Sequence, residues 1–144
     1  MRSPAELTEV FRAQGLKITP QRQAIFRVLY DNEEHPTAEA VYATVVNEMP
    51  SISLRTVYQT LNDLAEMGEI QSLDLGTGAA RFDPNVDDHH HLVCDRCGAI
   101  ADVQVDVSGL SPRELDGFQV ERPQVILHGR CPRCAGVAAV AATA

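Results

Sequence analysis

Residues 83–97 read DPNVDDHHHLVCDRC and bring many potential metal ligands into one short stretch. They contain three consecutive histidines, four aspartates and the first of two Cys-x-x-Cys pairs. The second pair, CPRC at residues 131–134, lies near the C-terminus. This arrangement predicts a metal-stabilised fold for the C-terminal part of the chain and sets it apart from the N-terminal part.

Composition and charge describe an ordinary globular protein with one basic region. The 144 residues are 44% hydrophobic and 22% charged, which is typical of folded domains. The net charge is -8, yet residues 1–30 carry five basic and two acidic side chains, so they sum to +3 and the remainder to -11. Such a region can bind DNA locally or be no more than a solvated helix face, and the charge alone leaves both open.

The N-terminal part has the order of a winged helix. Apolar residues at helical spacing predict helices over 6–14 and 20–30 and two more that start after Thr37 and Ser53. Two short strands, 70–75 and 79–82, then flank a Gly-Thr-Gly turn. The fourth helix would enter the major groove and the hairpin would be the wing. The alternative is a surface helix of an all-α domain.

The C-terminal part alternates with the period of strands. We expect strands at 89–94, 99–107, 118–122 and 124–129, and a short helix that opens with the capping box at 111–114. The fold class is therefore α+β, with a winged-helix DNA-binding domain followed by a small α/β domain that needs a metal or a partner for stability. The predicted bounds are 1–83 for the first domain, 84–134 for the second and 135–144 for a flexible tail.

The two cysteine pairs predict a structural zinc ion, one per subunit. The chain shows no secretory signal and no run of apolar residues long enough to span a membrane, so we expect a cytoplasmic protein. Disulfides are rare in the cytoplasm, so paired cysteines in a cytoplasmic protein more often bind a metal. Four thiolates fill the tetrahedral coordination of a zinc ion and leave no open position. An iron–sulfur centre or a redox pair of thiols is the alternative. The predicted ligands are Cys94, Cys97, Cys131 and Cys134.

The histidines predict a second, different metal site. His89 and His91 point to one face of a strand, and Asp102 on the next strand can face them. Asp83 at the domain boundary and His35 in a loop complete a set of three nitrogen and two carboxylate ligands. This mixture suits Fe²⁺ or Mn²⁺ better than zinc. Alternatively, His35 is an ordinary loop histidine and the triple-histidine run a solvated turn.

Four motifs together resemble the ferric uptake regulator superfamily over about residues 5–134. The motifs are LKITPQR at 16–22, SLRTVY at 53–58, RFD at 81–83 and HHHLVCDRCG at 89–98. The resemblance implies a homodimeric, metal-dependent winged-helix repressor that binds an inverted-repeat operator in double-stranded DNA. It also implies that the second domain dimerises and that a regulatory metal lies at the hinge.

Within the superfamily the chain is more similar to the peroxide-responsive branch than to the iron-uptake branch. Asp102 stands where iron-uptake regulators generally have glutamate, and Pro123 occupies the place of a further histidine ligand. The resemblance implies that peroxide, with Fe²⁺ bound, oxidises a ligand histidine, His35 or His89, and so releases the operator. Members of the family commonly have an arginine directly after the tyrosine of the fourth helix, and this chain has Gln59 there.

The predicted DNA contacts lie in the basic N-terminal region and on the fourth helix. They are Arg12, Lys17, Arg22, Arg55, Tyr58 and Gln59. Two rival functions stay open at this point. The first is a regulator of the same fold that responds to the supply of iron, manganese, nickel or zinc. The second is a small metal hydrolase or redox enzyme, which the sequence disfavours because no catalytic base remains once five ligands are assigned.

Overall fold

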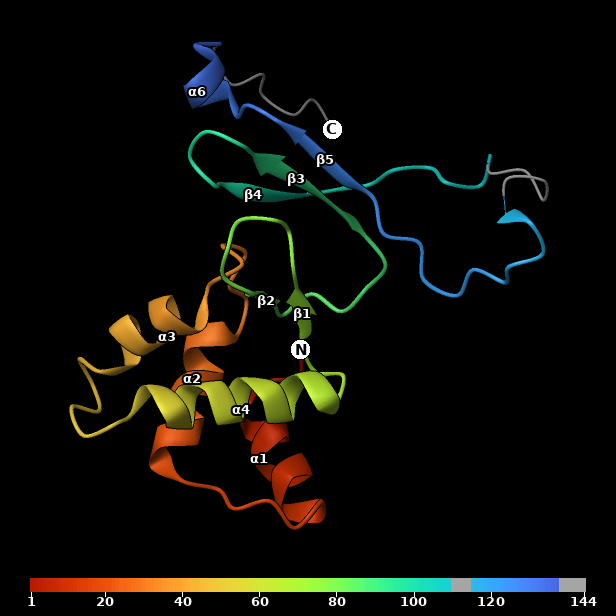
Figure 1. Ribbon diagram of the computed structural model, residues 1–144. Helices are drawn as coiled ribbons and strands as arrows, with labels where there is room; N and C mark the ends of the chain where they lie inside the picture. The colour runs from red at the N-terminus through yellow and green to blue at the C-terminus, as the bar shows by residue number, and fades with distance from the viewer. Residues whose placement is uncertain (110–114, 138–144) are drawn as a thin grey trace. The chain divides into compact units, whose positions relative to one another are not determined.

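The structure is a computed structural model that describes residues 1–109 and 115–137. The chain forms two compact units, Met1–Val86 and a second that starts at Asp87. Helices and strands are mixed, as the predicted α+β class requires, and the elements of each unit can be followed in Figure 1. Within the described residues, no helix has the length and apolar character needed to cross a membrane.

The first unit is a cluster of four helices followed by a two-stranded hairpin (Figure 1). Each helix starts at a hydroxyl side chain that accepts a hydrogen bond from the backbone N–H three residues later. These caps are Ser3, Thr19, Thr37 and Ser53. The elements are α1 (Pro4–Ala13), α2 (Pro20–Leu29), α3 (Ala38–Val45), α4 (Leu54–Glu66), β1 (Gln71–Leu73) and β2 (Arg81–Asp83).

An apolar core holds these helices together. Phe11 of α1 and Phe26 of α2 meet edge to face, with ring centroids 5.0 Å apart, and both are fully buried. Leu61 and Leu64 of α4 and Phe82 of β2 are buried in the same cluster. Because the apolar face of α4 packs against this core, its opposite face is available to solvent or to a partner. The order of helices and hairpin is that of a winged helix, as the sequence predicted.

The second unit is built on a three-stranded sheet in the order β4-β3-β5. The strands β3 (His90–Cys94) and β4 (Ile100–Val103) are antiparallel, and β5 (Ile126–Gly129) pairs in parallel with β3. The short helix α6 (Pro132–Ala135) follows. The predicted strand at 118–122 is absent from the structure. Phe118 is 80% exposed and Pro123 has no N–H to donate to a ladder, so this stretch runs as loop.

Two predictions fall on residues outside the described part of the chain. The capping box at 111–114 lies in the undescribed stretch 110–114, and most of the predicted tail lies in 138–144. The strands that the sequence placed at 89–94 and 124–129 are present with slightly shorter bounds, as β3 and β5.

Candidate metal centres and DNA-reading helix

The four cysteines form one cluster in the second unit. Cys94 ends β3, Cys97 lies in the turn after it, Cys131 is the N-cap of α6 and Cys134 lies within that helix. Their sulfur atoms lie within 4.8 Å of one another. Gly98, with φ of +73°, makes the tight turn that lets the first pair of thiols face the second.

This cluster fits a tetrahedral zinc ion. Zn–S bonds of about 2.3 Å give a tetrahedron whose sulfurs are roughly 3.8 Å apart. The sulfurs of Cys97 and Cys131 are 3.7 Å apart. Hydrogen bonds from the backbone of Cys131 and Cys97 lower the pKa of the Cys94 thiol to about 6, which favours the thiolate form that zinc binds. The donor set is all sulfur and leaves no open position, which is the pattern of a structural site.

A histidine–aspartate cluster is formed by His89, which directly precedes β3, His91 of β3 and Asp102 of the adjacent strand β4. His91 and Asp102 are directly opposite in the ladder. Asp102 Oδ1 lies 3.3 Å from His89 Nε2 and 3.7 Å from His91 Nε2. Both histidine side chains are 1% exposed, whereas the Asp102 side chain is 37% exposed. Neighbouring ligands on an ion held at about 2.1 Å are roughly 3.0–3.4 Å apart, so these three side chains are close to coordinating distance.

The tautomer of His89 is fixed by its own backbone neighbourhood. Its Nδ1 lies 2.6 Å from the carbonyl oxygen of Asp87, and a carbonyl can only accept, so Nδ1 carries the proton. In the neutral ring Nε2 is then the lone-pair donor, and this atom faces Asp102. His90 points away from this pair, and its Nδ1 accepts a hydrogen bond from the backbone N–H of Val125 at 3.0 Å. Residues 89–91 therefore present two histidines that could bind a metal, and the third, His90, holds the chain before β5.

His35 and Asp83 form a second pair, within the first unit. His35 Nε2 lies 3.3 Å from Asp83 Oδ2, and both side chains are almost fully buried. His35 has φ of +50°, a conformation that non-glycine residues adopt rarely and that tends to mark functional sites. Its loop is tied to β2, because Arg81 donates to the carbonyl of His35 and Phe82 N–H donates to the carbonyl of Pro36.

The helix α4 presents a polar face to solvent. Arg55, Tyr58 and Gln59, which the sequence suggested as DNA contacts on this helix, are all exposed. Tyr58 donates its hydroxyl hydrogen to Glu39 Oε1 of α3 at 2.7 Å. Gln59 Nε2 donates to Asp63 Oδ1, one turn further along the helix, at 2.9 Å.

The three basic candidates before α4 differ in their surroundings. Lys17 is exposed between α1 and α2, and Arg12 is exposed and paired with Glu9 at 2.7 Å. Arg22 is engaged inside the first unit. It donates to Asp63 Oδ2 at 2.8 Å, its side chain is 15% exposed, and its guanidinium carbon lies 5.3 Å from the ring centre of Phe11. Arg22 therefore joins α2 to α4 and has less freedom to reach a phosphate than Lys17.

Sequence analysis missed two acidic partners of the polar face of α4. Asp63 lies four residues after Gln59, a spacing at which helical side chains meet, so the pattern could have shown it. Glu39 lies on a different helix, 19 residues from Tyr58, and no local pattern connects the two.

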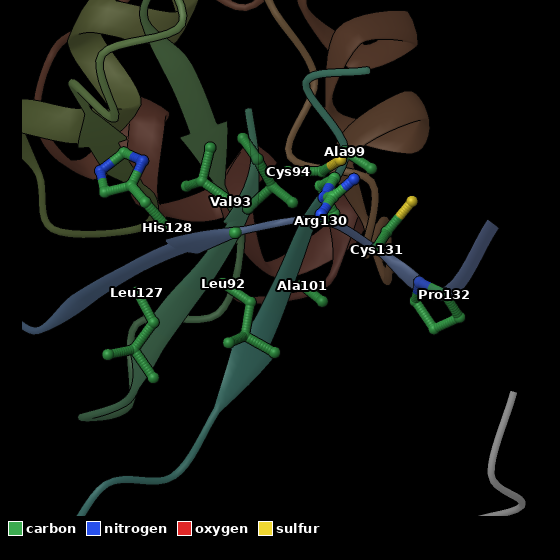
Figure 2. Close-up of a pocket in the computed structure, with 12 residues that line it drawn as sticks. Leu92, Val93, Cys94, Ala99, Ala101, Leu127, His128, Arg130, Cys131 and Pro132 are labelled. Carbon is green, nitrogen blue, oxygen red and sulfur yellow. The ribbon is translucent and has the colours of Figure 1, made fainter. Parts of the chain in front are cut away.

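An apolar groove of about 240 Å³ lies on the sheet of the second unit. Leu92 of β3 pairs with Ala101 of β4 and with Leu127 of β5, so these three side chains form a row across the strands. Figure 2 shows the row along one side of the sheet. Leu92 and Leu127 are 41% and 43% exposed. Apolar side chains aligned and exposed in this way mark a surface that favours a partner.

A winged-helix unit joined to a unit whose cysteine cluster and histidine–aspartate cluster could hold metal ions is typical of one class, the metal-dependent DNA-binding regulators. The chain belongs to the ferric uptake regulator family, since the model described as "Ferric uptake regulator family" matches residues 13–128. The chain is similar to the peroxide-responsive repressor PerR of Staphylococcus aureus (strain Mu50 / ATCC 700699). The identity is 35% over 127 residues, which cover 85% of each chain.

Solved structures of the family have the same fold. The ferric uptake regulator of Vibrio cholerae superimposes with a TM-score of 0.71 at 28% identity, over 85% of this chain and 98% of that one. PerR from Streptococcus pyogenes superimposes with a TM-score of 0.55 at 31% identity, over 93% and 94% of the two chains. The predicted family and fold class are thereby confirmed.

Proposed function

We propose that this chain is a transcriptional repressor that senses hydrogen peroxide through a metal site made of His35, Asp83, His89, His91 and Asp102. The observation that carries the proposal is the contact of Asp102 with both His89 and His91, which gives a mixed nitrogen and oxygen donor set. Such a set suits Fe²⁺ and Mn²⁺. The solved structure of PerR from S. pyogenes is described as the structural basis for peroxide sensing and gene regulation. The S. aureus relative is named a peroxide-responsive repressor.

The regulatory ligands come from both compact units. His35 and Asp83 belong to the first, whereas His89, His91 and Asp102 belong to the second. One ion shared by all five would restrict the angle between the units. A metal shifts such an equilibrium only if it binds one arrangement better than the other. The arrangement that gathers all five ligands is therefore the one that metal favours, and we propose that it is the one that binds DNA.

Peroxide would act by damaging a ligand. Fe²⁺ held by these five residues would supply the one-electron chemistry that reduces the O–O bond of peroxide, and Mn²⁺ held there would not. The overall change is the transfer of one oxygen atom from hydrogen peroxide to the imidazole of His35 or His89, with the other oxygen leaving as water. An oxidised imidazole is a poorer ligand, so the preference for the DNA-binding arrangement is lost. The burial of both side chains confines the reaction to an oxidant made beside them.

The DNA partner is an inverted-repeat operator read by two copies of α4. Regulators of this family bind DNA as dimers, and two-fold proteins match two-fold sites. We propose that a second copy of this chain covers the row of Leu92, Ala101 and Leu127. This row belongs to the sheet of a small unit with little core of its own, which is where a partner is most needed. Lys17 and Arg55 would contact the DNA backbone or bases, and that binding should weaken with salt.

The zinc site of the four cysteines would be structural. It would hold the turn after β3 to the start of α6, and so keep the sheet in the form that carries His89 and His91. The sulfur donor set fits zinc and offers no place for a substrate.

The test is whether peroxide modifies the named histidines. Fe²⁺-loaded protein treated with a small excess of peroxide should gain 16 Da on a peptide that carries His35 or His89, while the Mn²⁺ form should gain nothing. Equal oxidation of the two forms, or none on either histidine, would refute the proposal. A regulator of metal supply would instead leave the Fe²⁺ form intact and still bound to DNA. Turnover of an ester or phosphate substrate would point to an enzyme.

A further inference from the structure

The hydroxyl of Tyr58 is held by a carboxylate of its own protein. Tyr58 lies on the exposed face of α4, and Glu39 lies in the first turn of α3. The phenol oxygen and Glu39 Oε1 are 2.7 Å apart. Both residues belong to the first unit and both are exposed, so the pair lies on the surface that the proposed function gives to DNA.

This contact decides which hydrogen-bonding role remains to Tyr58. A phenol has one hydrogen, and an ionised carboxylate can only accept. The bond lowers the pKa of Glu39 and raises the pKa of Tyr58, so the proton stays on the phenol. With its hydrogen committed to Glu39, the hydroxyl oxygen offers only lone pairs to anything that approaches α4.

The neighbouring side chain is constrained in a similar way. Gln59 donates to Asp63, which is itself held by Arg22. One N–H of the amide and its carbonyl remain for a partner, and this pair of groups is the one that glutamine uses for adenine. Acidic side chains of the first unit thus set the hydrogen-bonding character of two adjacent residues on α4, whereas Arg55 on the same face is a pure donor.

We propose that Glu39 is a positioning residue that determines DNA sequence preference by keeping the Tyr58 hydroxyl an acceptor. This inference rests on the proposed function, in which α4 enters the major groove. There the bases that donate are adenine and cytosine, through their exocyclic amino groups, whereas thymine and guanine present acceptors at the corresponding places. Tyr58 should therefore select adenine or cytosine at one position of each half-site.

Two simpler roles of Glu39 make different predictions. If Glu39 acts only by repelling phosphates, its removal should strengthen binding to every sequence equally. If it only joins α3 to α4, its removal should lower the melting temperature and weaken binding without changing which base is preferred. A change of base preference at a single position is the readout that neither role produces.

The experiment is selection of binding sites from duplexes with a randomised segment, using full-length zinc-containing protein loaded with Mn²⁺. Four proteins are compared: wild type, Glu39→Ala, Tyr58→Phe and the double variant. Glu66→Ala serves as the control, because Glu66 is an exposed acid at the end of α4 and its loss changes the net charge equally. Melting temperatures are measured in parallel.

Wild type should favour adenine or cytosine at one position of each half-site by about five- to tenfold, the size of one hydrogen bond. Glu39→Ala should remove that preference, because the freed hydroxyl can donate as well as accept, and Glu66→Ala should keep it. In the Tyr58→Phe background, loss of Glu39 should have no further effect on base preference. An enriched wild-type site that Glu39→Ala leaves unchanged would overturn this inference alone. Failure of the wild type to enrich any sequence would overturn both it and the proposed function.

Discussion

Removal of zinc should unfold the second unit and leave the first intact. Among the described residues of the second unit, Val93 and Cys94 are the buried hydrophobic side chains, each 4% exposed. Burial of one valine side chain contributes about 1.5–3 kcal/mol, and ordering each residue costs about 1–2 kcal/mol of backbone entropy. The apolar contacts of the sheet therefore cannot hold it alone, whereas a structural zinc contributes about 10–16 kcal/mol.

The perturbation is Cys131→Ser, which removes one sulfur ligand from the start of α6. Zinc content is measured by elemental analysis, and folding by limited trypsin digestion with mass spectrometry of the fragments. We expect zinc loss, rapid cleavage within residues 87–137 and a protected fragment from the first unit. Wild-type protein stripped of zinc by a strong chelator should be cleaved in the same way as Cys131→Ser. Adding zinc back should restore the resistance of the second unit to trypsin in the wild type but not in Cys131→Ser. A zinc-free protein whose second unit stays protected would refute the reasoning.

Three further changes test separate parts of the account. Asp102→Ala should weaken Mn²⁺ binding, measured by calorimetry, by more than about 100-fold, because mutating a residue that only supports a ligand costs at most about that much affinity. Asp106→Ala is the control. If Asp102→Ala and Asp106→Ala bind Mn²⁺ with the same affinity, Asp102 is not a ligand. Leu127→Glu should turn the dimer into a monomer in light scattering, and an unchanged mass would exclude that face. Asp63→Ala should lower the unfolding free energy by roughly 1–3 kcal/mol in urea titrations, because it leaves the mostly buried Arg22 without its carboxylate. An unchanged free energy of unfolding would show that the pair contributes nothing to stability.

Local chemistry explains why most of the fold could be predicted from the sequence. The hydroxyl caps Thr19, Thr37 and Ser53 each precede an apolar face at helical spacing, and each starts a helix. The prediction of a strand at 118–122 was wrong. Alternating apolar and polar residues are compatible with a strand but are not sufficient to form one. A strand also needs a neighbour with which to pair, and no described strand pairs with this stretch.

The two side-chain clusters that could hold a metal were predictable from the sequence for a similar reason. Two Cys-x-x-Cys turns and alternate histidines on a strand are short patterns whose geometry follows from the backbone. The partners of α4 are different in kind. The pairing of Tyr58 with Glu39 depends on how α3 packs against α4, and the engagement of Arg22 by Asp63 depends on how α2 packs there. Tertiary contacts of this sort leave no mark in local spacing.

The measurement that tests the central claim most directly is operator binding by the Fe²⁺ and Mn²⁺ forms, each before and after a low dose of hydrogen peroxide. The account predicts that both forms bind beforehand and that only the Fe²⁺ form releases the DNA afterwards. If both forms stay bound, peroxide is not the signal, and the chain responds to metal supply instead.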